Sequence, residues 1–366
     1  MIIIAFLALF LVGVGALFYF WNRFHKFHFV QEIAKEHKKR SWLVAAVPVL
    51  ILVLLFFLKT VIAVIISLHL LVFWILCDFI AWLIKRFAKK SSEKYFAGIA
   101  AILITTVYLC IGWYYGHHVF ETHYSVESNK DLGMERLRIV QISDSHLGCT
   151  FDGDGFAEYM KRVQKTKPDL VVVTGDFVDD DSKRAEMIKA CKALGDLETT
   201  YGVYFVYGNH DRGYFNTRDF SADELDTELE KNNVMILKDE MVEICPEILL
   251  VGRRDRSEAG RQEMADLVST DDIKNKYVIV LDHQPHDFDA QEKAGVDLVL
   301  CGHTHGGQMF PVGITGELSG ENDKTYGLEK RGATTFIVNS GISDWAIPFK
   351  TAAIAEYGVI DVVRSE

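Results

Sequence analysis

The last two thirds of the chain have far fewer basic than acidic residues, and the cysteines show no paired spacing. Of the 39 Lys and Arg and the 50 Asp and Glu, residues 1–116 hold 12 and 4, so residues 117–366 hold 27 and 46, a net charge of −19. An acidic surface repels nucleic acid backbones, so we expect no nucleic acid partner. The six cysteines include no CxxC spacing, and both free thiols and disulfide pairs stay open.

The chain also lacks a basic segment before its first apolar run. A cleavable signal peptide begins with positive charge and ends at a small-residue cleavage site, so residues 1–21 do not fit that class. No internal repeat and no low-complexity segment occurs in the sequence.

Long apolar runs fill the first third of the chain. Four of them reach about the 17–25 residues that cross a bilayer as a helix. They cover residues 1–21, 42–58, 60–84 and 95–116. Buried helices of a soluble core are normally shorter and amphipathic, which disfavours that alternative. We therefore predict a transmembrane domain of four helices over residues 1–116.

The basic residues between these runs predict an orientation, because cytoplasmic loops carry an excess of Lys and Arg. Two loops are basic, and they hold Arg23, Lys26, Lys35, Lys38, Lys39 and Arg40 in the first and Lys85, Arg86, Lys89, Lys90 and Lys94 in the second. The turn between the second and third runs holds only Lys59. We expect a multi-pass protein of the cell membrane whose N-terminus and C-terminal domain lie outside the cytoplasm.

Residues 117–136 are polar and rich in His, Glu and Ser, and we interpret them as a linker. From residue 137 onward, strand-like and helix-like segments alternate, which predicts a layered α/β domain over residues 137–366. Ser221 with Glu224 three residues later is a capping box that begins one of the helices. Neighbouring strand-like runs within 234–251 and near the C-terminus predict mixed β-sheets flanked by helices.

Five strand-like runs are each followed by residues of the types that bind metals. These residues are Asp144 and His146, Asp176, Asn209 to Asp211, His283, and His303 with His305. Carboxylate, amide and imidazole groups are the donors that hold divalent ions. Gly208 and Gly302 come directly before a candidate ligand, where glycine lets the chain turn sharply. Each fragment is weak alone, but the ordered set predicts one metal site, built by loops that meet at a sheet edge.

These fragments resemble the five sequence blocks of the calcineurin-like metallophosphoesterases. The blocks are SDSH (143–146), TGD (174–176), GNHD (208–211), HQP (283–285) and GHTHGGQ (302–308). The resemblance covers about residues 138–345. The last block is similar to a membrane-associated bacterial branch, which includes enzymes similar to the hydrolases of lipid A precursors.

The resemblance implies a role for each residue. Asp144, His146 and His305 would hold one divalent metal ion, and Asn209, His283 and His303 a second. Asp176 would bridge both ions. His210 would face the substrate phosphate and assist the leaving group, with Asp211 orienting it. A donor set without sulfur suits Mn²⁺, which we favour, and also Fe or Zn²⁺.

Other residues are candidates for substrate contact. Arg253 and Arg254 follow a strand-like run, and a guanidinium group suits a phosphate. The alternative for both is a solvated loop. Relatives are expected to carry a substrate-lining loop with a basic residue where this chain has Asp344 and Trp345. The preference of the enzyme for a particular leaving group therefore stays undetermined.

The sequence therefore predicts an integral membrane, metal-dependent phosphoesterase. It would hydrolyse a phosphoester or pyrophosphate bond with a metal-bridging hydroxide. Four spans exceed what an anchor needs, which suggests a lipid-linked substrate at the outer membrane face. One alternative is an extracytoplasmic phosphodiesterase acting on nucleotides, cell-wall phosphodiesters or phosphoproteins. Another is a non-catalytic metal-binding membrane sensor, which the complete set of motifs disfavours.

Overall fold

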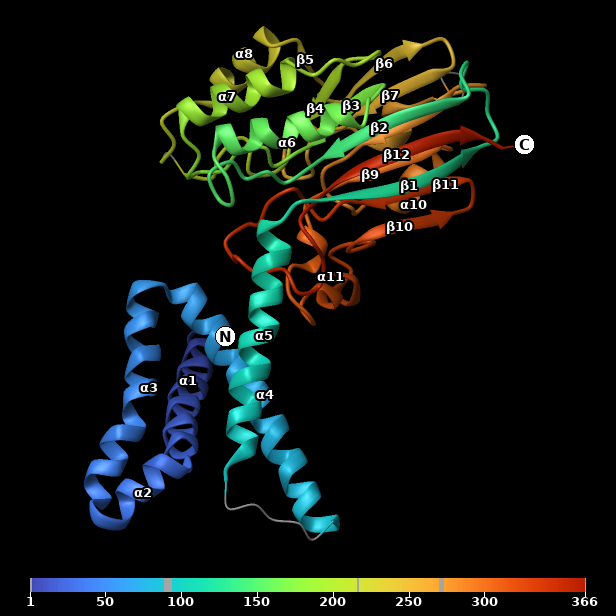
Figure 1. The fold of residues 1–366 in the computed structure, drawn as a ribbon. Coiled ribbons are helices and arrows are strands. Elements are labelled where there is room, and N and C mark those ends of the chain that lie inside the picture. The colour runs from blue at the N-terminus through green and yellow to red at the C-terminus, as the bar shows by residue number, and fades with distance from the viewer. Residues whose placement is uncertain (1, 89–93, 216, 270–272, 366) are drawn as a thin grey trace. The chain divides into compact units, whose positions relative to one another are not determined.

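The chain forms two compact units, residues 1–111 and residues 112–366 (Figure 1). The computed structural model describes residues 2–88, 94–215, 217–269 and 273–365, with side chains from residue 12 onward. The sequence predicted a boundary between the two domains at residue 116. The C-terminal unit begins a few residues earlier, at Gly112. It includes the last turn of the helix that ends the apolar region.

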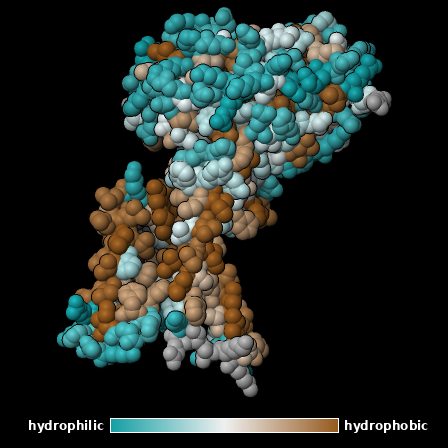
Figure 2. Space-filling model, viewed as in Figure 1, coloured by the Kyte–Doolittle hydropathy of each residue, from teal (hydrophilic) through white to brown (hydrophobic). Residues whose placement is uncertain are grey.

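The N-terminal unit is helical. Its helices are α1 (Ile2–His25), α2 (His28–Glu36), α3 (Lys38–Leu58), α4 (Thr60–Phe87) and α5 (Phe96–His117), the last of which continues into the C-terminal unit. Within the described residues, α3, α4 and α5 are long and apolar enough to cross a membrane. Much of their surface is apolar (Figure 2). The protein is thus a membrane protein, and the part of the chain that the structure describes contains three such helices where the sequence predicted four.

The difference concerns the first predicted span, residues 1–21. This segment lies in α1, but residue 1 and the side chains of residues 2–11 lie outside the described part. The predicted basic loop after residue 21 contains the additional helix α2, and the second basic loop includes residues 89–93, which also lie outside the described residues.

One acidic side chain within the apolar helices has a complete set of partners. Asp78 of α4 forms an ion pair with the Arg23 guanidinium of α1 at 2.8 Å. It also accepts hydrogen bonds from the hydroxyls of Tyr19 at 2.9 Å and Tyr95 at 2.6 Å. A charged group in an apolar setting needs such partners, because it otherwise loses its hydration without compensation.

The C-terminal unit contains two six-stranded mixed sheets. The first has the order β1-β12-β2-β3-β4-β5, and the second the order β10-β11-β9-β8-β7-β6. The first sheet comprises β1 (Phe120–Ser128), β12 (Glu356–Arg364), β2 (Arg136–Ile142), β3 (Leu170–Thr174), β4 (Val203–Val206) and β5 (Val234–Ile236). The second comprises β10 (Gly327–Arg331), β11 (Thr334–Val338), β9 (Leu298–Cys301), β8 (Tyr277–Leu281), β7 (Ile248–Gly252) and β6 (Glu240–Cys245). The predicted α/β class with mixed sheets is confirmed.

The segment 117–136 is not a linker over its whole length. It contains β1, which pairs in parallel with β12 along nine residues from Phe120 to Ser128. Exposed and half-buried positions alternate along most of β1 because it is an edge strand with one open face. Its polar outer face accounts for the linker-like composition.

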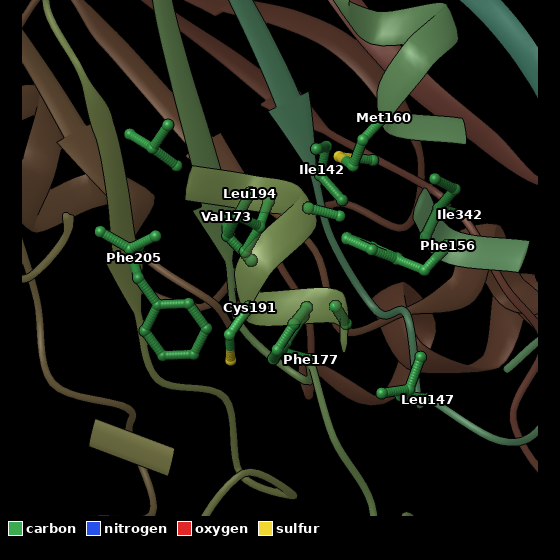
Figure 3. Packing of buried hydrophobic residues seen from close by; sticks show 14 of the residues in the cluster. Ile142, Leu147, Phe156, Met160, Val173, Phe177, Cys191, Leu194, Phe205 and Ile342 are labelled. Atoms are coloured by element: carbon green, nitrogen blue, oxygen red, sulfur yellow. The ribbon is translucent and has the colours of Figure 1, made fainter. Parts of the chain in front are cut away.

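Helices cover both outer faces of the two sheets. The helices are α6 (Gly153–Lys165), α7 (Arg184–Gly195), α8 (Ala222–Lys231), α9 (Met264–Leu267), α10 (Phe288–Lys293), the 3-10 turn η1 (His305–Gly307) and α11 (Gly313–Ser319). One core packs α6, α7 and α8 onto the first sheet through residues such as Phe156, Cys191 and Phe205 (Figure 3). A second core lies between the sheets, and a third lies under α9 and α10.

Alternating residues of a strand serve different cores, as the period of two requires. Ile139 lies in the core between the sheets, whereas Val140 and Ile142 face the helices. The predicted capping box is confirmed, since the Ser221 side chain accepts from Glu224 and the Glu224 side chain accepts from Ser221. In both sheets the central strands are parallel neighbours, β2-β3-β4 and β7-β8-β9, which brings their carboxyl ends to a shared edge.

Candidate metal centre

The five predicted groups of polar residues come together at the carboxyl ends of strands from both sheets. Asp144 and His146 follow β2, Asp176 follows β3, and Asn209 follows β4. The histidines His283, His303 and His305 follow β8 and β9 of the second sheet. The site is therefore formed between two sheet edges, rather than at the edge of one sheet as expected.

Asp144, His146 and His305 form one buried group whose donor atoms lie within 4.8 Å of one another, close enough to hold a metal ion. The Nε2 atoms of the two histidines are 3.1 Å apart. The His305 Nε2 atom lies 3.8 Å from an Asp144 carboxylate oxygen. Nitrogen and oxygen lone pairs that face each other in a buried space repel unless protons or a cation lie between them, which fits a cation site.

A second group consists of Asp176, His283 and His303. The His283 Nε2 atom lies 3.1 Å from Asp176 Oδ2 and 3.1 Å from the Asn209 side-chain oxygen. The same Asp176 oxygen lies 3.6 Å from His146 Nε2 in the first group. Asp176 is thus the side chain that the two groups share.

The backbone around these side chains adopts conformations that L residues seldom take. Five of the candidate ligands have positive φ: Asp144 (50°), His146 (34°), Asp176 (52°), His303 (73°) and His305 (50°). Such strain persists only where the surrounding fold imposes it, and its clustering points to a functional site. A Cβ on Gly208 would lie 2.2 Å from Asp176 Oδ1, so only glycine fits there.

Two of the histidines, His303 and His305, are kept in the neutral form that metal binding needs. Burial, reinforced by the nearby charge of His283, lowers the pKa of His303 to about 4. Burial and the neighbouring His146 also lower the pKa of His305. His283 Nδ1 donates to the Thr174 carbonyl at 2.8 Å, which directs Nε2 toward the site. The donor set and its orientation therefore fit divalent ions.

Asp179, which the sequence did not single out, links two histidines of the site. One of its carboxylate oxygens lies 3.1 Å from His146 Nδ1, and the other lies 3.1 Å from His210 Nδ1. Each imidazole therefore donates from Nδ1 to Asp179 and leaves Nε2 free for other contacts. The signal in the sequence was a further carboxylate three residues after Asp176, in TGDFVD.

Asp211 does not orient the His210 side chain, which corrects the expectation. Its fully buried carboxylate accepts hydrogen bonds from four backbone N–H groups, those of Asp176, Phe177, Val178 and Gly208, at 2.7–3.0 Å. Asp211 thus joins the loops after β3 and β4. His210 is held instead by Asp179 and through its backbone N–H, which donates to Asp176 Oδ1 at 2.8 Å.

A cavity of about 970 Å³ opens over these groups. His210 lies in its lining, with the rings of Trp345 and Tyr214 centred 5.1 Å and 5.0 Å from the imidazole. Besides its polar residues, the lining contains the apolar side chains of Phe215, Val312, Trp345, Ala346 and Ile347. Asp344, by contrast, is buried and accepts from the Gln308 amide at 3.3 Å.

Arg253 and Arg254 do not line this cavity. Arg253 is 1% exposed, and its Nη1 atom forms ion pairs with Asp282 at 3.0 Å and Asp287 at 2.7 Å. The Arg254 Nε atom lies 3.4 Å from Asp239. Both guanidinium groups are paired with carboxylates away from the cavity, so neither is positioned to contact a phosphate there.

Comparison with known proteins gives a family match over the segment that carries the site. Residues 137–307 match the sequence model described as calcineurin-like phosphoesterase. A metallophosphoesterase of Aquifex aeolicus is 35% identical over 200 residues, which is 52% of this chain and 72% of the relative.

Two further relatives are matched over a smaller share of their length. A metallophosphoesterase of Helicobacter pylori is 34% identical over 230 residues, covering 61% of this chain and 58% of the relative. A Danio rerio protein described as a transmembrane protein with metallophosphoesterase domain is 30% identical over 236 residues, covering 60% of this chain and 52% of the relative. The chain thus spans a little more than half the length of these two proteins.

The role of Asp211 is testable by Asp211→Asn. An amide presents a donor to backbone N–H groups that need an acceptor, so we expect a loss of at least about 2 kcal/mol of unfolding free energy, the scale of one charged hydrogen bond. Thermal unfolding of the purified full-length protein measures this change. A variant with wild-type stability that is deficient only in catalysis would show instead that Asp211 acts on His210.

Proposed function

Since the chain belongs to the calcineurin-like metallophosphoesterase family, we propose that it is a hydrolase of phosphoester bonds that uses two divalent metal ions and acts on a lipid-linked phosphate outside the cytoplasm. The position of Asp176 carries the two-ion part of this proposal. One oxygen of this carboxylate lies within 3.6 Å of nitrogens from both histidine groups.

The ligand assignment follows the two groups. Asp144, His146 and His305 would hold one ion, and Asn209, His283 and His303 the other, with Asp176 between them. The Asn209 amide nitrogen donates to the Tyr214 hydroxyl at 2.8 Å, which leaves its oxygen for the metal. We favour Mn²⁺, and the nitrogen and oxygen donors also suit Fe or Zn²⁺.

Two bound ions would lower the pKa of a shared water and neutralise charge on the phosphate. The protein supplies the remaining steps. His210 donates its Nδ1 proton to Asp179, so Nε2 is the atom available to the cavity. A proton at that atom stabilises the charge that develops on the phosphate or leaving oxygen. The Trp345 and Tyr214 rings beside His210 limit its rotation.

The cavity wall favours a substrate with an apolar portion. Phe215, Val312, Trp345 and Ile347 line it, and apolar side chains gain by contact with hydrocarbon rather than water. A lipid would place its phosphate at the metal groups and its hydrocarbon chains against these apolar side chains. The apolar helices α3, α4 and α5 keep the protein in the membrane that contains such lipids.

The aromatic side chains support one alternative substrate class. Tyr214, Phe215 and Trp345 all line the cavity, and aromatic rings stack on nucleobases. An extracytoplasmic phosphodiesterase acting on nucleotides is therefore the second candidate. The acidic character of residues 117–366 disfavours polyanionic substrates but does not oppose a single nucleotide.

We expect the metal centre to be required for turnover of p-nitrophenyl phosphate or its bis-ester. Chelation should abolish activity, and added Mn²⁺ should restore it. His210→Ala should lower kcat by about 10²–10⁴-fold while metal content stays at the wild-type level. Asp179→Asn should reduce metal affinity or activity by about 10–100-fold. Steady-state rates and elemental analysis measure both effects.

Asp289→Asn is the matched control, because this carboxylate is 80% exposed on the domain surface. It should leave the rate unchanged. If His210→Ala retains the wild-type rate, the proposed role of His210 fails. Wild-type protein that binds metals but turns over neither ester would support the sensor instead.

The substrate class is tested by direct competition between lipid and soluble phosphates. We expect the full-length protein in nanodiscs to show a higher kcat/KM for a diacyl phosphate monoester or a polyprenyl pyrophosphate than for adenosine nucleotides. Phosphate release and mass spectrometry of the lipids measure this preference. Efficient nucleotide hydrolysis with no turnover of the lipids would select the nucleotide alternative.

The orientation is tested by protease access in spheroplasts that express the full-length protein. Basic loops lie on either side of the second and third predicted spans, and their charge supports a C-terminal unit outside the cytoplasm. External protease should therefore digest residues 117–366 without lysis, while a cytoplasmic marker protein stays intact. Protection of this unit until the cells are lysed would reverse the proposed topology.

A further inference from the structure

An exposed apolar segment lies beside the metal centre, in residues 310–318. Phe310, Val312, Ile314 and Leu318 are 60%, 60%, 49% and 81% exposed. We refer to residues 310–318 as the apolar lip. Glu317 is the sole charged residue within 310–318, and its carboxylate accepts the Thr325 N–H at 2.6 Å. Large apolar side chains gathered on one surface segment mark an interaction site.

The lip is joined closely to the metal centre. It includes α11, which packs on the η1 turn that carries His305. A Cβ on Gly307 would lie 2.2 Å from Gly313 Cα, so the two backbones are in direct contact. Val312, Gly313, Thr315 and Gly316 also line the cavity. The lip is thus both an exposed apolar surface and one wall of the site.

The lip is also linked to the end of the membrane helix α5. Within the C-terminal unit, the Gly112 carbonyl accepts the Lys350 N–H at 2.9 Å. A Cβ on Gly112 would lie 2.6 Å from the Thr351 methyl, and Thr351 Oγ1 accepts the Phe310 N–H at 3.1 Å. One residue, Thr351, therefore contacts both the last turn of α5 and the first residue of the lip.

That last turn has the composition of a membrane–water boundary. Trp113, Tyr114 and Tyr115 are consecutive and partly exposed. Tryptophan and tyrosine gather at this depth of a bilayer because their rings are amphipathic. Through Thr351, the lip is one residue contact away from this turn.

We propose that the apolar lip inserts into the lipid leaflet in which α5 ends and forms the side of the cavity through which a lipid phosphate is taken up. The insertion follows from the exposed side chains and from the link through Thr351. The uptake of a lipid rests on the proposed function. The lip gives the cavity direct access to hydrocarbon, so a lipid need not leave the bilayer for its phosphate to reach Asp176 and His210.

Insertion is tested by photocrosslinking in the full-length protein in nanodiscs of phosphatidylcholine and phosphatidylglycerol. Benzoylphenylalanine replaces Phe310 or Leu318, neither of which lines the cavity. Met241 is the matched control position, since it is 38% exposed on β6, at the opposite edge of the second sheet from β10. We expect lipid adducts at Phe310 and Leu318 several-fold above those at Met241, detected by mass spectrometry.

Adduct yields no higher than at Met241, or crosslinks that join two copies of the chain instead, would overturn the insertion. Kinetics of Phe310→Ser and Leu318→Ser supply the second measurement. Both should raise the KM for lipid phosphate in vesicles and leave p-nitrophenyl phosphate hydrolysis unchanged. Met241→Ser should change neither. Lipid adducts without any turnover of lipid phosphates would keep the insertion and reject the lipid substrate, so the two proposals fail separately.

Discussion

The site depends on one buried carboxylate, that of Asp211, which holds two loops together by their backbones. It accepts N–H groups from Asp176, Phe177 and Val178 after β3 and from Gly208 after β4. Four donors on one carboxylate leave little freedom to either loop. Because of this contact, the Asp176 side chain receives the His210 N–H and stands between the two histidine groups.

The rest of the centre follows from bringing two sheet edges close to this junction. The first sheet supplies carboxylates and Asn209, and the second supplies three of the histidines. Such close approach requires glycine at Gly208 and imposes positive φ on Asp144 and His303. The strain is offset by well-packed cores on both sides of each sheet, and it directs side chains of different strands into one small volume.

Features that depend on one strand and its end could be predicted from the sequence, and those that depend on contacts between loops could not. The candidate ligands could be recognised because they lie just after buried strands. Asp179 was missed because its partners, His146 and His210, come from other loops. Arg253 was misread because its carboxylate partners lie about 30 residues later in the chain. The edge strand β1 resembled a linker because one of its faces is open to water.

The central claim is that two metal ions share Asp176, and it is tested most directly by electron paramagnetic resonance of the Mn²⁺-loaded full-length protein. The account predicts two ions per chain and the spectrum of a spin-coupled pair, because a bridging carboxylate holds the ions close together. Asp176→Asn should remove the coupling. One ion per chain with the spectrum of isolated Mn²⁺ in the folded wild-type protein would contradict the account.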